Sequence, residues 1–127
     1  MLQSVKVLGV DLVSKYSNII PMIQTEQQKF ELRAHMFKAL AHPMRLRMLD
    51  MLKKKPWCVC ELAREVGIDK SVASKHLSQL KDAGLIEDEK RGTIVEYSLV
   101  APCVLELAAC AEGAVLNNRK RRLGIVE

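Results

Sequence analysis

The sequence predicts a mainly α-helical fold with one small β-hairpin, and three observations support this prediction. Helical periodicity runs through most of residues 24–82, glycines fall where two successive helices should end, and residues 93–99 alternate as a half-buried strand does. The signals give four helices, a hairpin and a last helix. This order is that of a winged helix-turn-helix, a module that places one helix in the DNA major groove.

The first two predicted helices lie on either side of a proline. Residues 24–41 carry apolar side chains at helical spacing, and residues 44–54 form the second helix. Pro43 separates the two, because proline disfavours helical backbone at the residue before it. The apolar positions of the first helix are Phe30, Ala34, Phe37 and Ala41.

The next two helices form the predicted helix-turn-helix. Pro56 suits the first turn of the third helix, where a missing N–H costs nothing, and Gly67 suits its end. The fourth helix begins after Asp69 or Ser71, each a suitable N-cap, and ends at Gly84. Its apolar face is Ala73, Leu77 and Leu80.

The fourth helix and the hairpin carry side chains suited to DNA. A reading helix needs short polar and basic groups facing outward, because these let the backbone approach and can donate to phosphates or bases. The hairpin, formed by residues 85–89 and 93–99, should meet the DNA backbone or minor groove with its basic tip. His76 has a second interpretation, in which it packs against the neighbouring helix. The candidate DNA-contacting residues are Lys70, Ser71, Ser74, Lys75, His76, Gln79, Lys90 and Arg91.

The domain organisation follows from the two ends of the chain. We expect residues 1–23 to be an apolar extension used in dimerisation, residues 24–118 the DNA-binding domain, and residues 119–127 a basic tail. The last helix, opened by Pro102, is apolar almost all round, which predicts burial on more than one side. In a chain of 127 residues, the second side should be another protomer.

Composition narrows the class of protein. The net charge of +5 fits a polyanionic partner. No apolar run approaches the roughly 18–20 residues of a membrane span, and the start lacks the pattern of a signal peptide. We therefore expect a cytoplasmic protein with reduced thiols and no membrane partner. The sequence has no Gly-rich phosphate loop, no paired carboxylate motif and no Cys–His arrangement suited to catalysis, so we expect neither enzymatic activity nor an organic cofactor.

The four cysteines are the candidate ligands for an inducer. Cys58 and Cys60 lie on the predicted third helix, where residues two apart point about 200° from each other. Two thiolates sharing one ion lie roughly 3.5–4 Å apart, so an intact helix cannot hold the ion, and the start of that helix must be frayed or must unwind. Cys103, just after the wing, is the favoured third ligand. Cys110 is less favoured, because a buried free cysteine is also a small core residue.

Four stretches covering about half of the chain match a known pattern in combination. They are HPMRLRMLDML at 42–52, CVCELA at 58–63, SVASKHLSQLKDAGLI at 71–86 and RGTIVEYSL at 91–99. Together they resemble the arsenical-resistance (ArsR/SmtB) family of metal-sensing repressors. The resemblance implies a homodimer built from the first and last helices, whose two reading helices meet a palindromic operator in double-stranded DNA. It also implies repression in the metal-free state and release of the operator when metal binds.

The resemblance further suggests roles for individual residues. It aligns Ser71, Ser74, Lys75 and His76 with the family's DNA contacts, and Cys58 to Cys60 with the metal-binding box of its thiolate-sensing branch. This chain has no cysteine in residues 1–57 and no histidine in its last helix, so ligands that other branches use at those places are missing.

The donor set favours a soft, thiophilic ion. Three thiolates would suit the metalloids As(III) or Sb(III), and a fourth would admit Cd(II), Pb(II) or Zn(II). We favour As(III). The alternative is a thiol-redox or persulfide-responsive repressor of the same fold, and constitutive DNA binding with structural cysteines is a further possibility.

Overall fold

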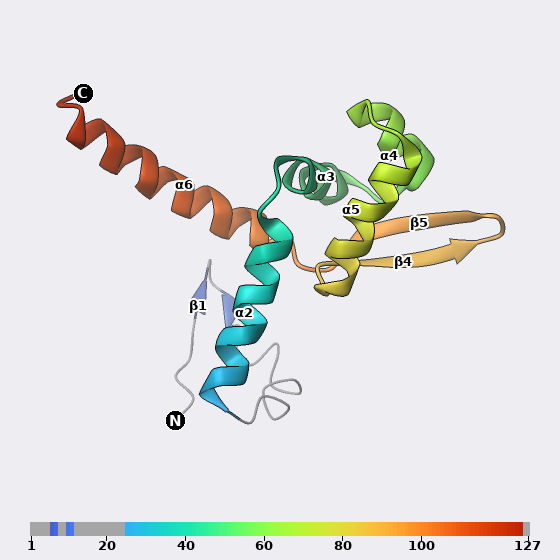
Figure 1. Cartoon of the computed structure of the whole chain (residues 1–127), viewed down its shortest axis with the longest axis horizontal. Coiled ribbons are helices and arrows are strands. Elements are labelled where there is room, and N and C mark those ends of the chain that lie inside the picture. Colours follow the sequence, from blue (N-terminus) through green and yellow to red (C-terminus); the bar gives the residue numbers. More distant parts are fainter. Residues whose placement is uncertain (1–5, 8–9, 12–24, 126–127) are drawn as a thin grey trace. The chain divides into compact units, whose positions relative to one another are not determined.

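The computed structural model describes Lys6–Val7, Val10–Asp11 and residues 25–125 (Figure 1). The chain divides into two compact units, residues 1–35 and 36–127, and each is described by itself. In the first unit, β1 (Lys6–Val7) pairs antiparallel with β2 (Val10–Asp11). Apart from this strand pair, the predicted dimerisation segment 1–23 lies outside the described residues.

The elements of the described region confirm the predicted winged helix-turn-helix. They are α2 (Glu26–Leu40), α3 (Pro43–Lys54), β3 (Trp57–Cys58), α4 (Val59–Val66), α5 (Lys70–Asp82), β4 (Ile86–Arg91), β5 (Ile94–Leu99) and α6 (Cys103–Arg122). In Figure 1, α4 and α5 form the helix-turn-helix, and β4 and β5 the long hairpin of the wing. No helix of this region is long and apolar enough to cross a membrane.

Local signals set the ends of α3 and α4. His42 caps α3, since its Nδ1 accepts a hydrogen bond of 3.1 Å from the backbone N–H of Met44, and Pro43 takes the first helical position. Gly67 ends α4 with a left-handed φ of 75°, and its N–H bonds to the carbonyl of Ala63. These ends agree with the sequence prediction.

Strand β3 departs from that prediction. The sequence suggests that Pro56 opens a helix, whereas Trp57 and Cys58 are extended and pair with Tyr97 and Glu96 of β5. The partner strand lies about 40 residues further along the chain, so nothing in the local pattern around Pro56 reveals the pairing. The wing is therefore a three-stranded antiparallel sheet, in the order β3-β5-β4, and α4 begins only at Val59.

Helix α6 is longer than predicted, and the burial predicted for its second side concerns a partner protomer, which a single chain does not contain. It continues to Arg122, so the basic residues 119–122 form its last turn instead of a separate tail. Cations are favoured there, because the helix dipole leaves the carboxyl end negative. Val104 is its only buried residue in this single chain, so the faces expected to be covered are open.

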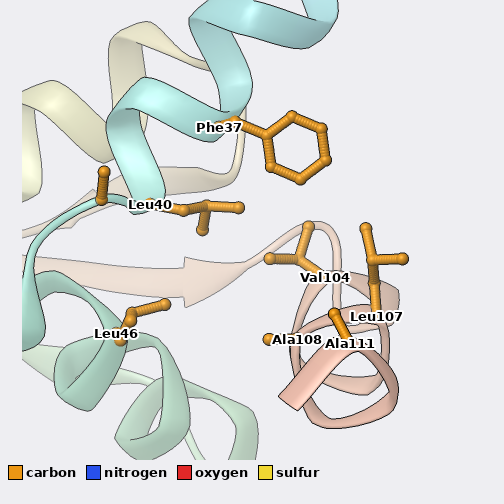
Figure 2. A pocket seen from close by; sticks show the side chains of 8 residues that line it. Phe37, Leu40, Leu46, Val104, Leu107, Ala108 and Ala111 are labelled. Atoms are coloured by element: carbon orange, nitrogen blue, oxygen red, sulfur yellow. The ribbon is translucent and has the colours of Figure 1, made fainter. Parts of the chain in front are cut away.

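An apolar groove of about 240 Å³ lies between α6, the end of α2 and α3. Figure 2 shows Phe37 and Leu40 facing Val104 and Leu107 across it. Phe37 is 50% exposed and Leu107 is 44% exposed, and contiguous apolar surface of this kind marks an interaction site. The lining residues are Phe37, Leu40, Ala41, Leu46, Val104, Leu107, Ala108 and Ala111.

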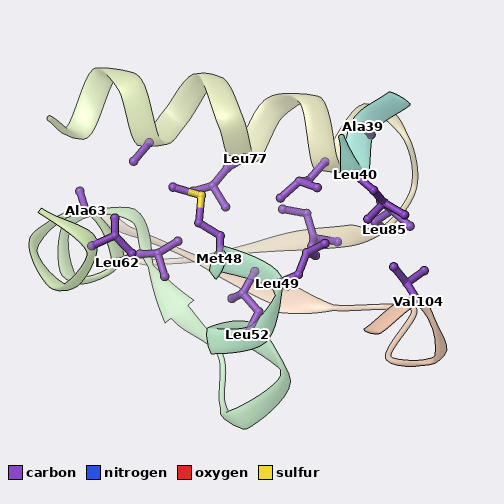
Figure 3. Close-up of a cluster of buried hydrophobic side chains, with 14 residues drawn as sticks. Ala39, Leu40, Met48, Leu49, Leu52, Leu62, Ala63, Leu77, Leu85 and Val104 are labelled. Carbon is purple, nitrogen blue, oxygen red and sulfur yellow. The ribbon is translucent and has the colours of Figure 1, made fainter. Parts of the chain in front are cut away.

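The core lies where α3, α4 and α5 meet. Figure 3 shows Leu77 reaching from α5 toward Met48 of α3. Both residues are fully buried, as are Leu49 and Leu62, and burying a side chain of this size contributes about 1.5–3 kcal/mol. The predicted apolar face of α5 is confirmed, because Ala73 and Leu80 are also fully buried. This packing determines which face of α5 is left to solvent.

Candidate nucleic-acid interface and thiol pair

The polar face of α5 points away from the core. The turn from Gly67 to Asp69 joins α4 to α5, and Asp69 is the N-cap, with extended backbone. The first turn of α5 contains no acidic residue, and the side chain of Asp69 makes no hydrogen bond to it. Among the predicted DNA-contacting residues of this helix, the exposed ones are Lys70, Ser71, Lys75 and Gln79, and the half-buried ones are Ser74 and His76.

The wing has a basic tip on an otherwise acidic hairpin. The turn lies at Gly92, whose φ is 64°, and Lys90 and Arg91 end β4 on the exposed surface. Arg91 Nη2 lies 3.4 Å from Glu89 Oε2 and 3.9 Å from Glu96 Oε1. Exposed pairs of this kind add little stability, but the nearby carboxylates weaken the attraction of Arg91 for a phosphate. The tip is therefore less basic than Lys90 and Arg91 alone would make it.

An ion pair ties the wing to the reading helix. Lys81, near the end of α5, donates to Asp88 of β4 at 3.0 Å. The hydrogen bond to Asp88 raises the pKa of Lys81, which therefore stays charged under all physiological conditions. The wing and α5 are thus linked by a side-chain contact as well as by the chain between them.

Cys58 and Cys60 lie at the junction between the sheet and the helix-turn-helix. Cys58 is half-buried and extended, with φ −81° and ψ 155°, and it pairs with Glu96 in β5. Cys60 is exposed in the first turn of α4. The two thiols do not share a regular helix, which agrees with the predicted alternative that the start of the helix is not regular. Cys58 already precedes the helix.

Trp57 sits beside this pair in a defined environment. Its indole N–H donates to the carbonyl of Met51 at 3.2 Å, and the ammonium of Lys55 lies 4.1 Å from the ring centroid. A cation over an indole face is an attractive contact. The only tryptophan of the chain is therefore held next to Cys58, where its fluorescence can report changes at the thiols.

The other two cysteines lie on α6. Cys103 is half-buried at the first residue of the helix, and Cys110 is exposed two turns later. Cys110 is therefore not a core residue of the single chain. Within the described residues, no group of three or more histidine, cysteine, aspartate or glutamate side chains could hold a metal ion. Cys58, Cys60 and Cys103 are accordingly not gathered in one protomer.

Arg45 is a residue that the sequence interpretation missed. It is 8% exposed, and it is the one buried charged side chain in the described part of the chain. Its guanidinium donates to the carbonyls of Ala39 and Lys38 and lies 3.5 Å from His76 Nδ1. The sequence did offer a signal for this burial. Arg45 and Met48 are three positions apart, which places them on the same face of a helix.

The chain is similar to known sequences and solved structures. Residues 42–88 match the model of the family described as bacterial regulatory protein, arsR family. The uncharacterised HTH-type transcriptional regulator Rv0081 of Mycobacterium tuberculosis is 34% identical over 99 residues, which cover 77% of this chain and 87% of the relative. Its crystal structure has a TM-score of 0.62 at 35% identity, covering 74% of this chain and 95% of that one.

Two further similar proteins have a described assembly or a described role. A solution NMR structure of the homodimeric winged helix-turn-helix DNA-binding domain of a Mycobacterium bovis protein has a TM-score of 0.64 at 28% identity, covering 77% of this chain and 93% of that one. The arsenic resistance transcriptional regulator ArsR1 of Pseudomonas putida is 33% identical over 85 residues, which cover 66% of each chain. The fold, the motifs and these similarities together show that the chain belongs to the arsR family of bacterial regulatory proteins, a family of DNA-binding transcriptional regulators and not of enzymes.

Proposed function

We propose that this protein is a homodimeric cytoplasmic repressor that releases a palindromic operator when a soft ion binds Cys58 and Cys60. The position of the thiol pair carries the proposal. Cys58 belongs to a strand that pairs with β5 of the wing, and Cys60 belongs to the helix that precedes α5 in the helix-turn-helix. A ligand that draws the two sulfurs together therefore acts on both DNA-contacting elements at once.

The open groove supports the homodimer. The apolar groove between α2, α3 and α6 leaves Phe37 and Leu107 half exposed, and a second copy of the chain would cover them. The similar Mycobacterium bovis domain is homodimeric, which supports the same assembly here. We propose that residues 1–23 extend this interface, as their apolar composition suggests.

The polar face of α5 supports the DNA contacts. Lys75 is exposed on the face opposite Leu77, so it can reach a phosphate without disturbing the core. We expect Lys75→Ala to weaken operator binding and to lower the slope of log affinity against log salt by about 0.9, the value for one lost phosphate contact. Fluorescence anisotropy at several salt concentrations measures this slope. Lys54→Ala, which removes an exposed cation at the end of α3, is the control and should leave the slope unchanged; equal changes in both variants would contradict the assignment.

The thiol chemistry supports the choice of ion. Two thiolates suit a soft ion, and the similar Pseudomonas putida protein is an arsenic resistance regulator, so As(III) is the favoured inducer. Sb(III), Cd(II), Pb(II) and Zn(II) are the other candidates. Cys58 and Cys60 would hold the ion, and Cys103, or less favourably Cys110, would supply a third sulfur after a rearrangement or from the partner protomer.

Titration of the protein–DNA complex tests the proposed inducer. A duplex selected from a random library serves as the probe, and arsenite, antimonite, Cd(II), Pb(II) and Zn(II) are added under reducing conditions. We expect arsenite to release the DNA at near-stoichiometric amounts and to change Trp57 fluorescence at the same concentration. Cys58→Ser and Cys60→Ser should each abolish release while leaving DNA affinity within about twofold. Cys103→Ser and Cys110→Ser then show which of the two completes the site.

The accessibility of the same thiols favours one second candidate. Cys60 is exposed and Cys58 is half-buried, so an oxidant or a persulfide can reach both. In that case a peroxide or polysulfide releases the DNA, and dithiothreitol restores binding. Release by these reagents, with no response to any of the five ions, would replace the metal-sensing proposal with the redox one.

A further inference from the structure

The buried Arg45 joins three parts of the DNA-binding domain. It rises from α3, and its guanidinium donates to the carbonyl of Ala39 and, at 3.3 Å, to that of Lys38. These carbonyls belong to the last turn of α2, and that of Lys38 also accepts the N–H of Ala41 at 3.2 Å. Its third nitrogen, Nη1, lies 3.5 Å from Nδ1 of His76 on α5. None of the ion pairs found among the described residues involves Arg45.

The hydrogen-bonding roles of these groups determine the protonation state of His76. A guanidinium can only donate, so Nδ1 of His76 must be the acceptor and any proton on the neutral ring must be on Nε2. The ring of His42 lies against that of His76, with centroids 4.5 Å apart and the two planes tilted by 49°. Its own Nδ1 accepts the N–H of Met44, so the cap of α3 and the contact to α5 meet at this histidine pair. A proton on Nδ1 of His76 would place an N–H donor directly opposite the N–H donor of Arg45 Nη1, and the hydrogen bond would be lost.

We propose that Arg45 is a positioning residue for DNA binding, which holds the reading helix to the end of α2 through His76 only while His76 is neutral. The inference rests on the proposed role of α5 as the reading helix. Because α2 and α6 line the proposed dimer groove, the contact links the position of α5 to that interface. The spacing of two reading helices across an operator depends on such a link.

The surroundings of His76 keep it neutral near pH 7. Burial and the nearby His42 and Arg45 all lower the pKa of His76 below its ordinary value of about 6.5. Both of these neighbours come from the α3 segment, and Lys75 precedes His76 on its own helix. The native state therefore binds fewer protons than the unfolded state below about pH 6.5. The contact is intact above that pH, and it is lost as the pH falls through the lowered pKa.

The pH dependence of specific DNA binding separates this role from simple electrostatics. Protonation that merely adds positive charge strengthens DNA binding as the pH falls. Loss of the Arg45–His76 contact is expected to weaken specific DNA binding as the pH falls. As the pH falls from about 7.5 through the lowered pKa of His76, we expect the wild-type protein to lose about threefold to tenfold of its preference for the selected duplex over a scrambled one.

Three variants complete the test. Arg45→Lys keeps the charge but replaces the three nitrogens of the planar guanidinium with one, which cannot reach the three separated acceptors, so we expect a lower preference at pH 7.5 and no fall on acidification. His76→Asn places a non-titrating acceptor near Nδ1 and should also remove the fall. Arg47→Lys, an exposed arginine on the same helix, is the matched control and should behave as wild type. Thermal unfolding confirms that each variant is folded.

The tautomer of His76 gives a measurement that needs no variant and no DNA. Nitrogen-15 NMR of the free protein should show His76 protonated on Nε2 at pH 7.5, with a pKa below about 6.5. A proton on Nδ1, a wild-type preference that rises on acidification, or an Arg45→Lys variant with the wild-type profile would each overturn the inference. If the protein selects no duplex at all, the proposed function fails, and the NMR result still decides whether the contact depends on neutral His76.

Discussion

Replacing Leu107 with glutamate is expected to separate the proposed dimer into monomers and to weaken operator binding by about 10²–10⁴-fold. Leu107 lines the apolar groove opposite Phe37, and a carboxylate there would be buried without a partner when a second copy covers it. A monomer binds one half-site at a time, so it loses the effective concentration that connects the two halves. Sedimentation equilibrium measures the dimer, and anisotropy measures operator affinity.

The control for this experiment is on the same helix. Ala109 is exposed and lies about 200° around α6 from Leu107, outside the groove. Ala109→Glu introduces the same charge and should leave both the dimer and its operator affinity near wild type. A Leu107→Glu protein that stays dimeric at micromolar concentration would show that the groove is not the dimer interface.

Truncating Leu77 to alanine is expected to lower the free energy of unfolding by about 2–5 kcal/mol. Leu77 is fully buried and reaches from α5 toward Met48, so its removal leaves a cavity beneath the reading helix. A domain of this size is stable by about 5–15 kcal/mol in all, so the loss is a large share of the total. Urea unfolding at a fixed protein concentration measures it, because dimerisation makes stability depend on concentration.

Val72→Ala is the matched control for Leu77→Ala. Val72 lies on the same helix but is 40% exposed, so the change should cost less than about 1 kcal/mol. Similar losses in the two variants would mean that the α5 face assigned to the core is wrong. That result would also contradict the assignment of the DNA-facing side of α5, because this side is defined as the one opposite the buried face.

The parts of the fold that the sequence predicts are those with local causes. Pro43 separates α2 from α3, and Gly67 and Gly84 end α4 and α5, through backbone preferences that act within a few residues; the structure confirms all three. The buried face of α5 follows from its own periodicity. Strand β3 could not be predicted in this way, because Pro56 satisfies the rules for a helix start and the competing partner, β5, is distant in the sequence.

The candidate site shows the same division. The spacing of Cys58 and Cys60 is visible in the sequence, but the conformation that frees Cys58 from the helix comes from its pairing with Glu96. Arg45 was missed because burial of a charge is unusual, and its hydrogen bonds to two carbonyls at the end of α2 come from the fold. The expected burial of α6 concerned the dimer, which a single chain does not contain.

The carboxylates that surround the basic tip of the wing have a consequence for solubility. Strand β4 is an outer strand of the β3-β5-β4 sheet, so its free backbone groups could pair with another molecule. Its exposed side chains include Glu87, Glu89 and Lys90, and charged edges of this kind resist association between molecules. A wing remade with apolar or uncharged residues to grip DNA more tightly would therefore be prone to aggregation. The acidic side chains of the hairpin limit how strongly the wing can bind DNA. The same side chains keep the exposed edge of the sheet from pairing with another molecule.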